Sequence, residues 1–192
     1  MFDLIRKNIE KNVRISDEEF NYFTSLLKRK RLRKKQFLLE EGEVCTEECF
    51  VNSGCLRMYK LNDKGQEHIL QFAVADWWIG DQLSFTTGEP SEFFIDALED
   101  SEVLLIDKDK LEQLYRDVPT FERSFRIGFQ NSYAALQQRI LSGLSQSAEE
   151  KYLGFIKRYP DLEQKLPQHQ VASYLGITPE SLSRIRKQLT GK

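Results

Sequence analysis

A polar and cationic group of side chains stands out near the end of the chain, between residues 168 and 189. Arg and Lys suit phosphate oxygens, and short polar side chains suit both phosphates and the base edges of the DNA grooves. These residue types together indicate contact with double-stranded DNA. The predicted DNA-contacting residues are Gln168, His169, Thr178, Glu180, Ser181, Ser183, Arg184, Arg186 and Lys187.

The apolar residues of the same segment are spaced as in two short helices that share one small core. They are Val171, Ala172, Leu175, Ile177, Leu182 and Ile185. Gly176 suits the positive-φ position that ends the first helix, Thr178 can cap the second helix, and Pro179 fits its first turn. The pattern predicts a helix-turn-helix. The alternative is an ordinary helical hairpin with a basic surface.

Charge is distributed unevenly along the 192 residues. The formal net charge is −2, but residues 151–192 contain eight Lys or Arg against three Asp or Glu, which gives +5 there and leaves −7 elsewhere. The positive charge accompanies the predicted helix-turn-helix. The sequence has no apolar run of about 18 residues and no apolar signal core at its N-terminus, so we expect a cytoplasmic protein without a membrane partner. Three cysteines, an odd number, argue against a disulfide framework.

The first part of the chain, up to about Lys28, is predicted to be helical, with Ser16 and Glu19 spaced as a capping box. Residues 28–35 (KRKRLRKK) follow, with seven basic side chains in eight positions. Because these residues lead directly into the strand-like QFLLEEG, we favour a solvated strand edge over a phosphate-binding patch.

Between Gln36 and Asp107 the pattern changes to short strands separated by turns. The segment Asn62-Asp63-Lys64-Gly65 is a strong hairpin-turn signal. Many short, evenly spaced strands predict a closed antiparallel barrel or jelly roll. Such a barrel commonly holds a small ligand.

Helical periodicity returns after Lys108, first over residues 111–117 and then over a long helix from Thr120 to about Leu144. We predict that a second copy of the chain packs along this helix, because a barrel of this size cannot cover it all. The alternative is a helix that packs only on its own barrel. The predicted domains are a barrel over 1–118, a dimerisation helix over 119–145 and a helix-turn-helix domain over 146–192. The predicted interface residues are Phe121, Phe125, Phe129, Tyr133, Leu136 and Ile140, with Leu144 continuing the stripe.

The order of barrel, long helix and helix-turn-helix resembles the Crp/Fnr family of bacterial transcription regulators. The clearest marks are VASYLGITPESLSRIRKQL and IGDQLSFTTGEPSEFFIDALEDSEVLLID. The resemblance implies an α+β fold with an antiparallel jelly-roll barrel of the cyclic-nucleotide-binding type, a homodimer, and double-stranded DNA as the partner, with RNA polymerase as a further one. It also implies that Glu180 and Arg184 reach base edges. Pro179 falls where some members carry another base-reading Arg.

The effector pocket departs from the family pattern. Members that bind cyclic AMP supply an Arg followed by Ser or Thr to the cyclic phosphate, and those two places hold Ser91 and Glu92 here. A carboxylate in place of a cation repels a phosphate, so we expect no cyclic AMP binding by the usual mode and no cofactor. The predicted residues of this degenerate pocket are Gly80, Asp81, Gln82, Ser91 and Glu92.

Other known features of the family fit the residues poorly. Cys45, Cys49 and Cys55 are one short of the four thiolates that hold an iron–sulfur cluster, so we expect them to be buried core residues. His68 and His169 have no marked partner for haem. The chain ends three residues after Leu189, which leaves no room for the β-hairpin wing that members often carry. We therefore expect phosphate contacts from the helix-turn-helix and a shallower salt dependence than in a winged relative.

We therefore expect a homodimeric regulator whose long helices hold two recognition helices one DNA turn, ~34 Å, apart. A ligand in the barrel could bias this arrangement if it prefers one of two states. We expect no enzyme, because jelly-roll metalloenzymes need several His and a carboxylate inside the barrel, and only His68 lies in that segment. A constitutive regulator without a ligand, and a signalling module whose helix-turn-helix docks a protein, remain as alternatives.

Overall fold

The computed structural model describes residues 2–160 and 162–190. The chain forms two compact units. One consists of Met1–Lys60 and Leu70–Gln130, and the other of Leu61–Ile69 and Asn131–Lys192. The second unit therefore combines the C-terminal helices with a short piece of the strand region.

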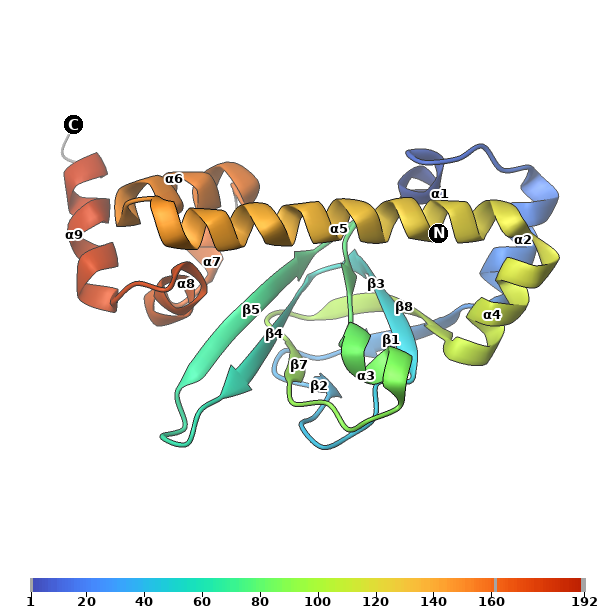
Figure 1. Cartoon of the computed structure of the whole chain (residues 1–192), viewed down its shortest axis with the longest axis horizontal. Coiled ribbons are helices and arrows are strands. Elements are labelled where there is room, and N and C mark those ends of the chain that lie inside the picture. Colours follow the sequence, from blue (N-terminus) through green and yellow to red (C-terminus); the bar gives the residue numbers. More distant parts are fainter. Residues whose placement is uncertain (1, 161, 191–192) are drawn as a thin grey trace. The chain divides into compact units, whose positions relative to one another are not determined.

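Two four-stranded sheets form the strand region (Figure 1). The first sheet has the order β1-β8-β3-β6, with bounds Lys28–Leu32, Ser101–Asp107, Glu47–Ser53 and Trp78–Ile79. The second has the order β2-β7-β4-β5, with bounds Phe37–Leu39, Phe94–Ala97, Cys55–Leu61 and Glu67–Val74. Neighbouring strands of the first sheet are antiparallel, as are β2 with β7 and β4 with β7. The predicted antiparallel jelly roll is confirmed.

Strand β3 shows how the sequence builds two apolar layers. Side chains alternate between the faces of a strand, so Cys49 and Val51 point into the core shared by the two sheets, whereas Phe50 points to the outer face. Strand β8 repeats the pattern, with Val103 inside and Leu104 outside. Both strands are therefore covered on both faces, which explains their continuous apolar stretches.

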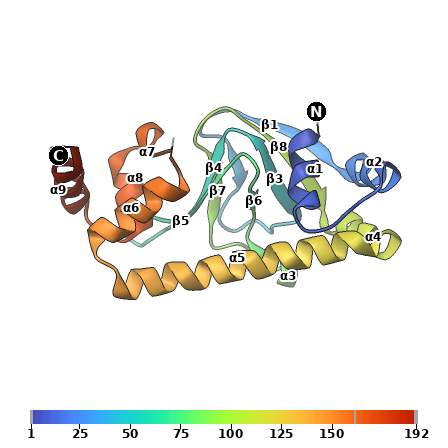
Figure 2. The same cartoon turned by 90° about the horizontal axis from the view of Figure 1, so that it is seen from above.

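Helices cover the outer face of the first sheet (Figure 2). They are α1 (Asp3–Glu10), α2 (Asp17–Leu26), α4 (Lys108–Asp117) and the beginning of α5 (Pro119–Ser145). The predicted capping box is present, because Ser16 accepts from the Glu19 N–H and Glu19 accepts from the Ser16 N–H. The N-terminal segment contains two helices, which the sequence prediction did not separate.

The β4–β5 hairpin turn is confirmed. The Gly65 N–H donates to the Asn62 carbonyl at 2.8 Å, and Gly65 has φ +72°, which is readily accessible to glycine. Two short elements of the strand region were not predicted: β6 and the helix α3 (Gln82–Thr87) that follows it.

The remaining helices are α6 (Ala148–Arg158), α7 (Leu162–Lys165), α8 (Gln168–Leu175) and α9 (Pro179–Thr190). A second capping box, formed by Ser147 and Glu150, begins α6. Within the described residues, no helix combines the length and apolar composition needed to cross a bilayer.

Helix α5 corrects part of the predicted dimer interface. Phe121 is fully buried and Phe125 is 8% exposed, packed with Phe23, Trp78 and Tyr115 in the outer apolar layer. The interface prediction is wrong at Phe121 and Phe125, because they have almost no free surface for another chain.

Candidate nucleic-acid interface

The turn between α8 and α9 is built as the sequence predicted. Gly176 has φ +65°, and a Cβ added there would meet no atom within 4 Å, so the positive φ rather than a lack of space favours glycine. The Ile177 N–H donates to the Ala172 carbonyl at 3.1 Å, and the Gly176 N–H to the Ser173 carbonyl at 3.1 Å. This is a Schellman motif, which satisfies the last carbonyls of α8 and turns the chain into α9.

Helix α9 begins with the predicted cap. The Ser181 N–H donates to the Thr178 Oγ1 at 3.2 Å, and Pro179 occupies the first helical position. Four of the six predicted core residues are buried: Val171, Ala172, Leu182 and Ile185. Leu175 and Ile177 are half-buried. The opposite face of α9 is thereby fixed toward solvent.

The predicted DNA-contacting residues differ in their exposure to solvent. His169, Thr178, Glu180, Arg184 and Lys187 are exposed. Gln168, Ser181, Ser183 and Arg186 are half-buried.

Both arginines among the predicted contacts have intramolecular partners. The Arg184 guanidinium lies 3.3 Å from the Ser181 Oγ, on the same exposed face of α9. The Arg186 guanidinium forms an ion pair with Glu163 at 2.9 Å. A phosphate must compete with Glu163 for Arg186, whereas the Arg184 contact is with a neutral hydroxyl.

One buried polar group in α8 was missed by sequence reasoning. Gln170 is 7% exposed, and its Oε1 has no hydrogen-bond partner among the described residues. Gln170 stands between His169 and Val171, and its polar side chain gives no sequence signal for burial.

In the predicted effector segment, the side chains bond to one another and to the start of α3. The Asp81 carboxylate caps α3 by accepting from the N–H groups of Leu83 at 3.0 Å and Ser84 at 3.3 Å. The Ser91 hydroxyl donates to the other Asp81 oxygen at 2.8 Å, and both residues are buried. A carboxylate therefore already uses the donors that an incoming anion would need.

The other predicted pocket residues are divided. Glu92 is exposed and forms an ion pair with Lys60 at 2.6 Å, which lowers the pKa of Glu92. Gln82 donates to the buried Glu48 at 2.7 Å. The structure brings Asp81 and Ser91 together, but Glu92 makes its contact at the surface.

A cavity of about 270 Å³ shares only Gly80 with the predicted pocket. Its lining is mainly apolar, with the thiol of Cys45 and two acidic residues. The lining residues are Leu38, Leu39, Glu43, Val44, Cys45, Thr46, Glu47, Ile79, Gly80, Ile95 and Leu105.

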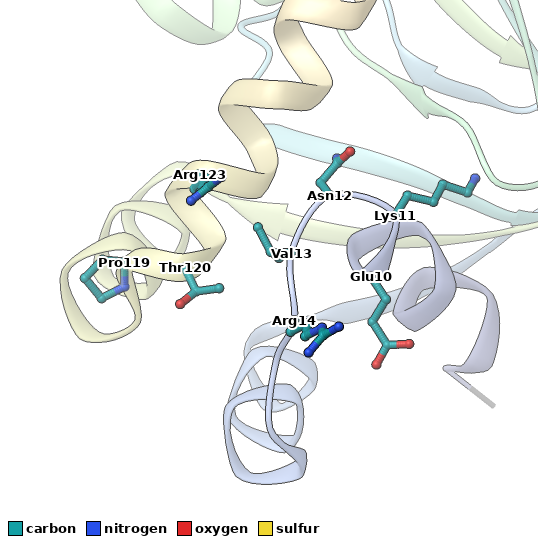
Figure 3. Close-up of a pocket in the computed structure, with 8 residues that line it drawn as sticks. All are labelled: Glu10, Lys11, Asn12, Val13, Arg14, Pro119, Thr120 and Arg123. Carbon is teal, nitrogen blue, oxygen red and sulfur yellow. The ribbon is translucent and has the colours of Figure 1, made fainter.

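A second, more open hollow of about 480 Å³ lies between the loop after α1 and the start of α5 (Figure 3). Its lining residues are Glu10, Lys11, Asn12, Val13, Arg14, Pro119, Thr120 and Arg123. It contains none of the residues predicted for the effector pocket.

The three cysteines are free and buried, as predicted. Burial raises the pKa of the Cys49 thiol well above its ordinary value, and nearby Glu48 acts in the same direction. The pKa of the Cys45 thiol is raised as well, mainly by burial, so Cys45 and Cys49 are held in the neutral, unreactive form. His68 is exposed on the β4–β5 hairpin, where its ring nitrogen lies 3.1 Å from the Asn62 amide nitrogen.

Comparisons with known proteins agree with this architecture. Residues 29–117 match the family model of the cyclic nucleotide-binding domain. The anaerobic regulatory protein of Pasteurella multocida is 25% identical over 187 residues, which cover 91% of this chain and 68% of the relative.

Solved structures share the fold at lower identity. FixK2 from Bradyrhizobium japonicum has a TM-score of 0.72 and 21% identity, covering 86% of this chain and 85% of FixK2. The c-di-GMP responsive global regulator CLP of Xanthomonas campestris has a TM-score of 0.73 and 14% identity, covering 92% of each chain.

A cyclic-nucleotide-binding-type jelly roll with a C-terminal helix-turn-helix defines a class of DNA-binding transcription regulators. Within that class, the chain is similar to the regulators of the Crp/Fnr family.

Proposed function

We propose that the protein is a homodimer that reads a two-fold symmetric duplex site with α9 of each protomer. The observation that carries this proposal is the free face of α9, where Glu180 and Arg184 are exposed on a helix whose start is capped and whose other face is buried. A guanidinium and a carboxylate can discriminate guanine and cytosine in the major groove.

The exposed part of α5 supports the homodimer. Tyr133, Leu136, Ile140 and Leu144 are between 51 and 82% exposed, and they recur at steps of three or four along the helix. An exposed apolar stripe of this kind is expected to be covered by a partner, and a second copy presents the same stripe. We assign the interface to this stripe and Phe129.

Selection from random duplexes tests the proposal directly. The protein is expected to enrich a symmetric site whose half-sites are one turn, ~34 Å, apart, and to bind it more weakly as salt rises. Enrichment of no sequence would contradict sequence-specific reading. Salt-independent capture of a protein partner by α9 would favour the alternative signalling module.

We also propose that the barrel does not bind cyclic AMP by the usual family mode. The Asp81 carboxylate uses the donors of α3 and Ser91, and no Arg stands at position 91 or 92. Titration calorimetry with micromolar cyclic AMP is expected to give no saturable heat. A saturable signal would overturn this point without affecting the assignment of α9.

We propose RNA polymerase as a further partner. We also propose that the protein acts in the cytoplasm and that the barrel has no catalytic role. The support for the last point is that His68, the one His of the strand region, is exposed on a hairpin. Transcription with purified RNA polymerase from a template carrying the selected site is expected to change when the protein is added. An unchanged transcript level would argue against this partner.

A further inference from the structure

The β4–β5 hairpin belongs to the same compact unit as the helix-turn-helix. Residues Leu61–Ile69 group with Asn131–Lys192. Strand β5 is the edge strand of its sheet, so one side of its backbone lacks a neighbouring strand. Helix α8 meets this open edge.

Ser173 on α8 takes the place of a neighbouring strand. Its hydroxyl donates to the Glu67 carbonyl at 2.6 Å and accepts from the Ile69 N–H at 3.1 Å. These two backbone groups, two residues apart, are a donor and an acceptor that a paired strand would otherwise use. One hydroxyl therefore satisfies both.

Arg139 on α5 closes the same junction. Its guanidinium donates to the Ile69 carbonyl at 3.2 Å and to the Tyr174 carbonyl at 3.3 Å. The guanidinium also lies 4.3 Å from the centre of the Tyr174 ring, and that ring packs against Phe155 of α6. Three elements, β5, α5 and α8, thus meet at two side chains.

We infer that Ser173 and Arg139 are positioning residues that clamp α8 to the edge of β5 and so hold the DNA-reading helix α9 at a defined orientation. The inference rests on the proposed reading of a two-half-site duplex by α9. The contacts of Ser173 and Arg139 do not cover the DNA-reading face of α9, because Glu180 and Arg184 on that face are exposed in the same structure.

Hydrogen exchange at the Ile69 N–H tests whether the clamp exists. Ser173→Ala removes the acceptor and should accelerate exchange of this amide about tenfold. Ser173→Thr keeps a hydroxyl and should restore most of the protection. Ser25→Ala is the matched control, because the Ser25 hydroxyl also donates to a backbone carbonyl, that of Tyr22, at 2.6 Å. Unchanged exchange in Ser173→Ala would overturn the clamp.

Operator spacing tests the positioning role. The selected duplex is compared with one that is longer by two base pairs between the half-sites. The wild-type protein should discriminate strongly between them, whereas Ser173→Ala and Arg139→Gln should lose about tenfold of that discrimination. A purely structural loss would weaken binding to both duplexes equally.

The two measurements separate the possible failures. Rapid exchange with an unchanged spacing preference would overturn positioning. Failure of the wild-type protein to select any duplex would instead contradict the proposed function. In that case the exchange rate of the Ile69 N–H would still show whether the clamp exists.

Discussion

Glu48 brings a carboxyl group into the apolar layer outside the first sheet. It is 2% exposed, and its described hydrogen-bond partner is Gln82, which donates at 2.7 Å. Desolvation raises the pKa of Glu48 to about 7, and the Gln82 hydrogen bond only partly offsets this. The residue therefore titrates near neutral pH in the buried layer between the first sheet and its helices.

The raised pKa gives a pH-dependent stability. The folded state binds the Glu48 proton more tightly than the unfolded state, so the contribution is fully present below pH 4.5 and is lost as pH rises through about 7. Between pH 5 and pH 8, wild type should lose up to about 3 kcal/mol of unfolding free energy relative to Glu48→Gln. Urea unfolding at both pH values measures this difference. Glu41→Gln, at an exposed position, is the control, and parallel pH profiles for wild type and Glu48→Gln would contradict the prediction.

Arg184 is the best placed side chain for reading a base. It is exposed, and its described intramolecular contact is with a neutral hydroxyl. Arg184→Ala should weaken binding to the selected duplex by about 1–3 kcal/mol and relax the preference at one base pair. Fluorescence anisotropy with single-base variants of the duplex measures both effects.

The matched control for Arg184 is Lys157→Ala, which removes one exposed cation from α6. It should leave the base preference intact. Equal loss of specific and random DNA binding in Arg184→Ala would make Arg184 a phosphate contact.

Helix α5 changes its surroundings along its length. Its first turns carry Phe121 and Phe125 into the barrel's outer layer, whereas Tyr133 to Leu144 carry an exposed apolar stripe. Leu136→Glu places a charge in that stripe on both protomers and should weaken dimerisation by about a hundredfold or more. Sedimentation velocity over a concentration series measures the change. Gln138→Glu adds the same charge on the opposite side of the helix and should have little effect; similar dissociation in both variants would argue against the stripe.

The elements that sequence predicted well are those specified by local chemistry. Gly176, Thr178 and Pro179 each satisfy a backbone requirement of the turn in which they stand. Strand alternation likewise follows from neighbouring residues. Short elements such as β6 and α3 were not predicted, because two to six residues show too little periodicity to indicate a strand or a helix.

Features that depend on distant residues could not be predicted. The apolar stripe of α5 is continuous in sequence, so its periodicity could not tell which turns are covered by the barrel's outer layer. Ser173 bonds a strand residue 106 positions away, and an isolated serine carries no mark of that contact. The loss of the usual phosphate partners at Ser91 and Glu92 was visible, but the Ser91–Asp81 hydrogen bond was not.

Charge across the whole molecule separates into a basic reading region and an acidic remainder, despite a net charge of −2. The basic run at β1 does not belong to the reading region in our interpretation. Arg29 pairs with Glu102 at 2.6 Å and Lys28 with Glu47 at 3.0 Å, on the edge strand of the first sheet. These ion pairs fit the predicted solvated strand edge, which charged side chains protect from further pairing.

The salt dependence of DNA binding tests this division of charge in the proposed dimer. Each helix-turn-helix releases counterions from the phosphates that it contacts. The slope of log K against log salt concentration should therefore be about twice as steep for a duplex with two half-sites as for a duplex with one. Arg31 on β1 is 88% exposed, and Arg31→Gln should leave both slopes unchanged. Lys187→Gln, on the exposed face of α9, should reduce the two-site slope by about 2 and the one-site slope by about 1. A reduced slope in Arg31→Gln would place β1 on the DNA backbone, because only a phosphate contact releases counterions in proportion to the charges it neutralises.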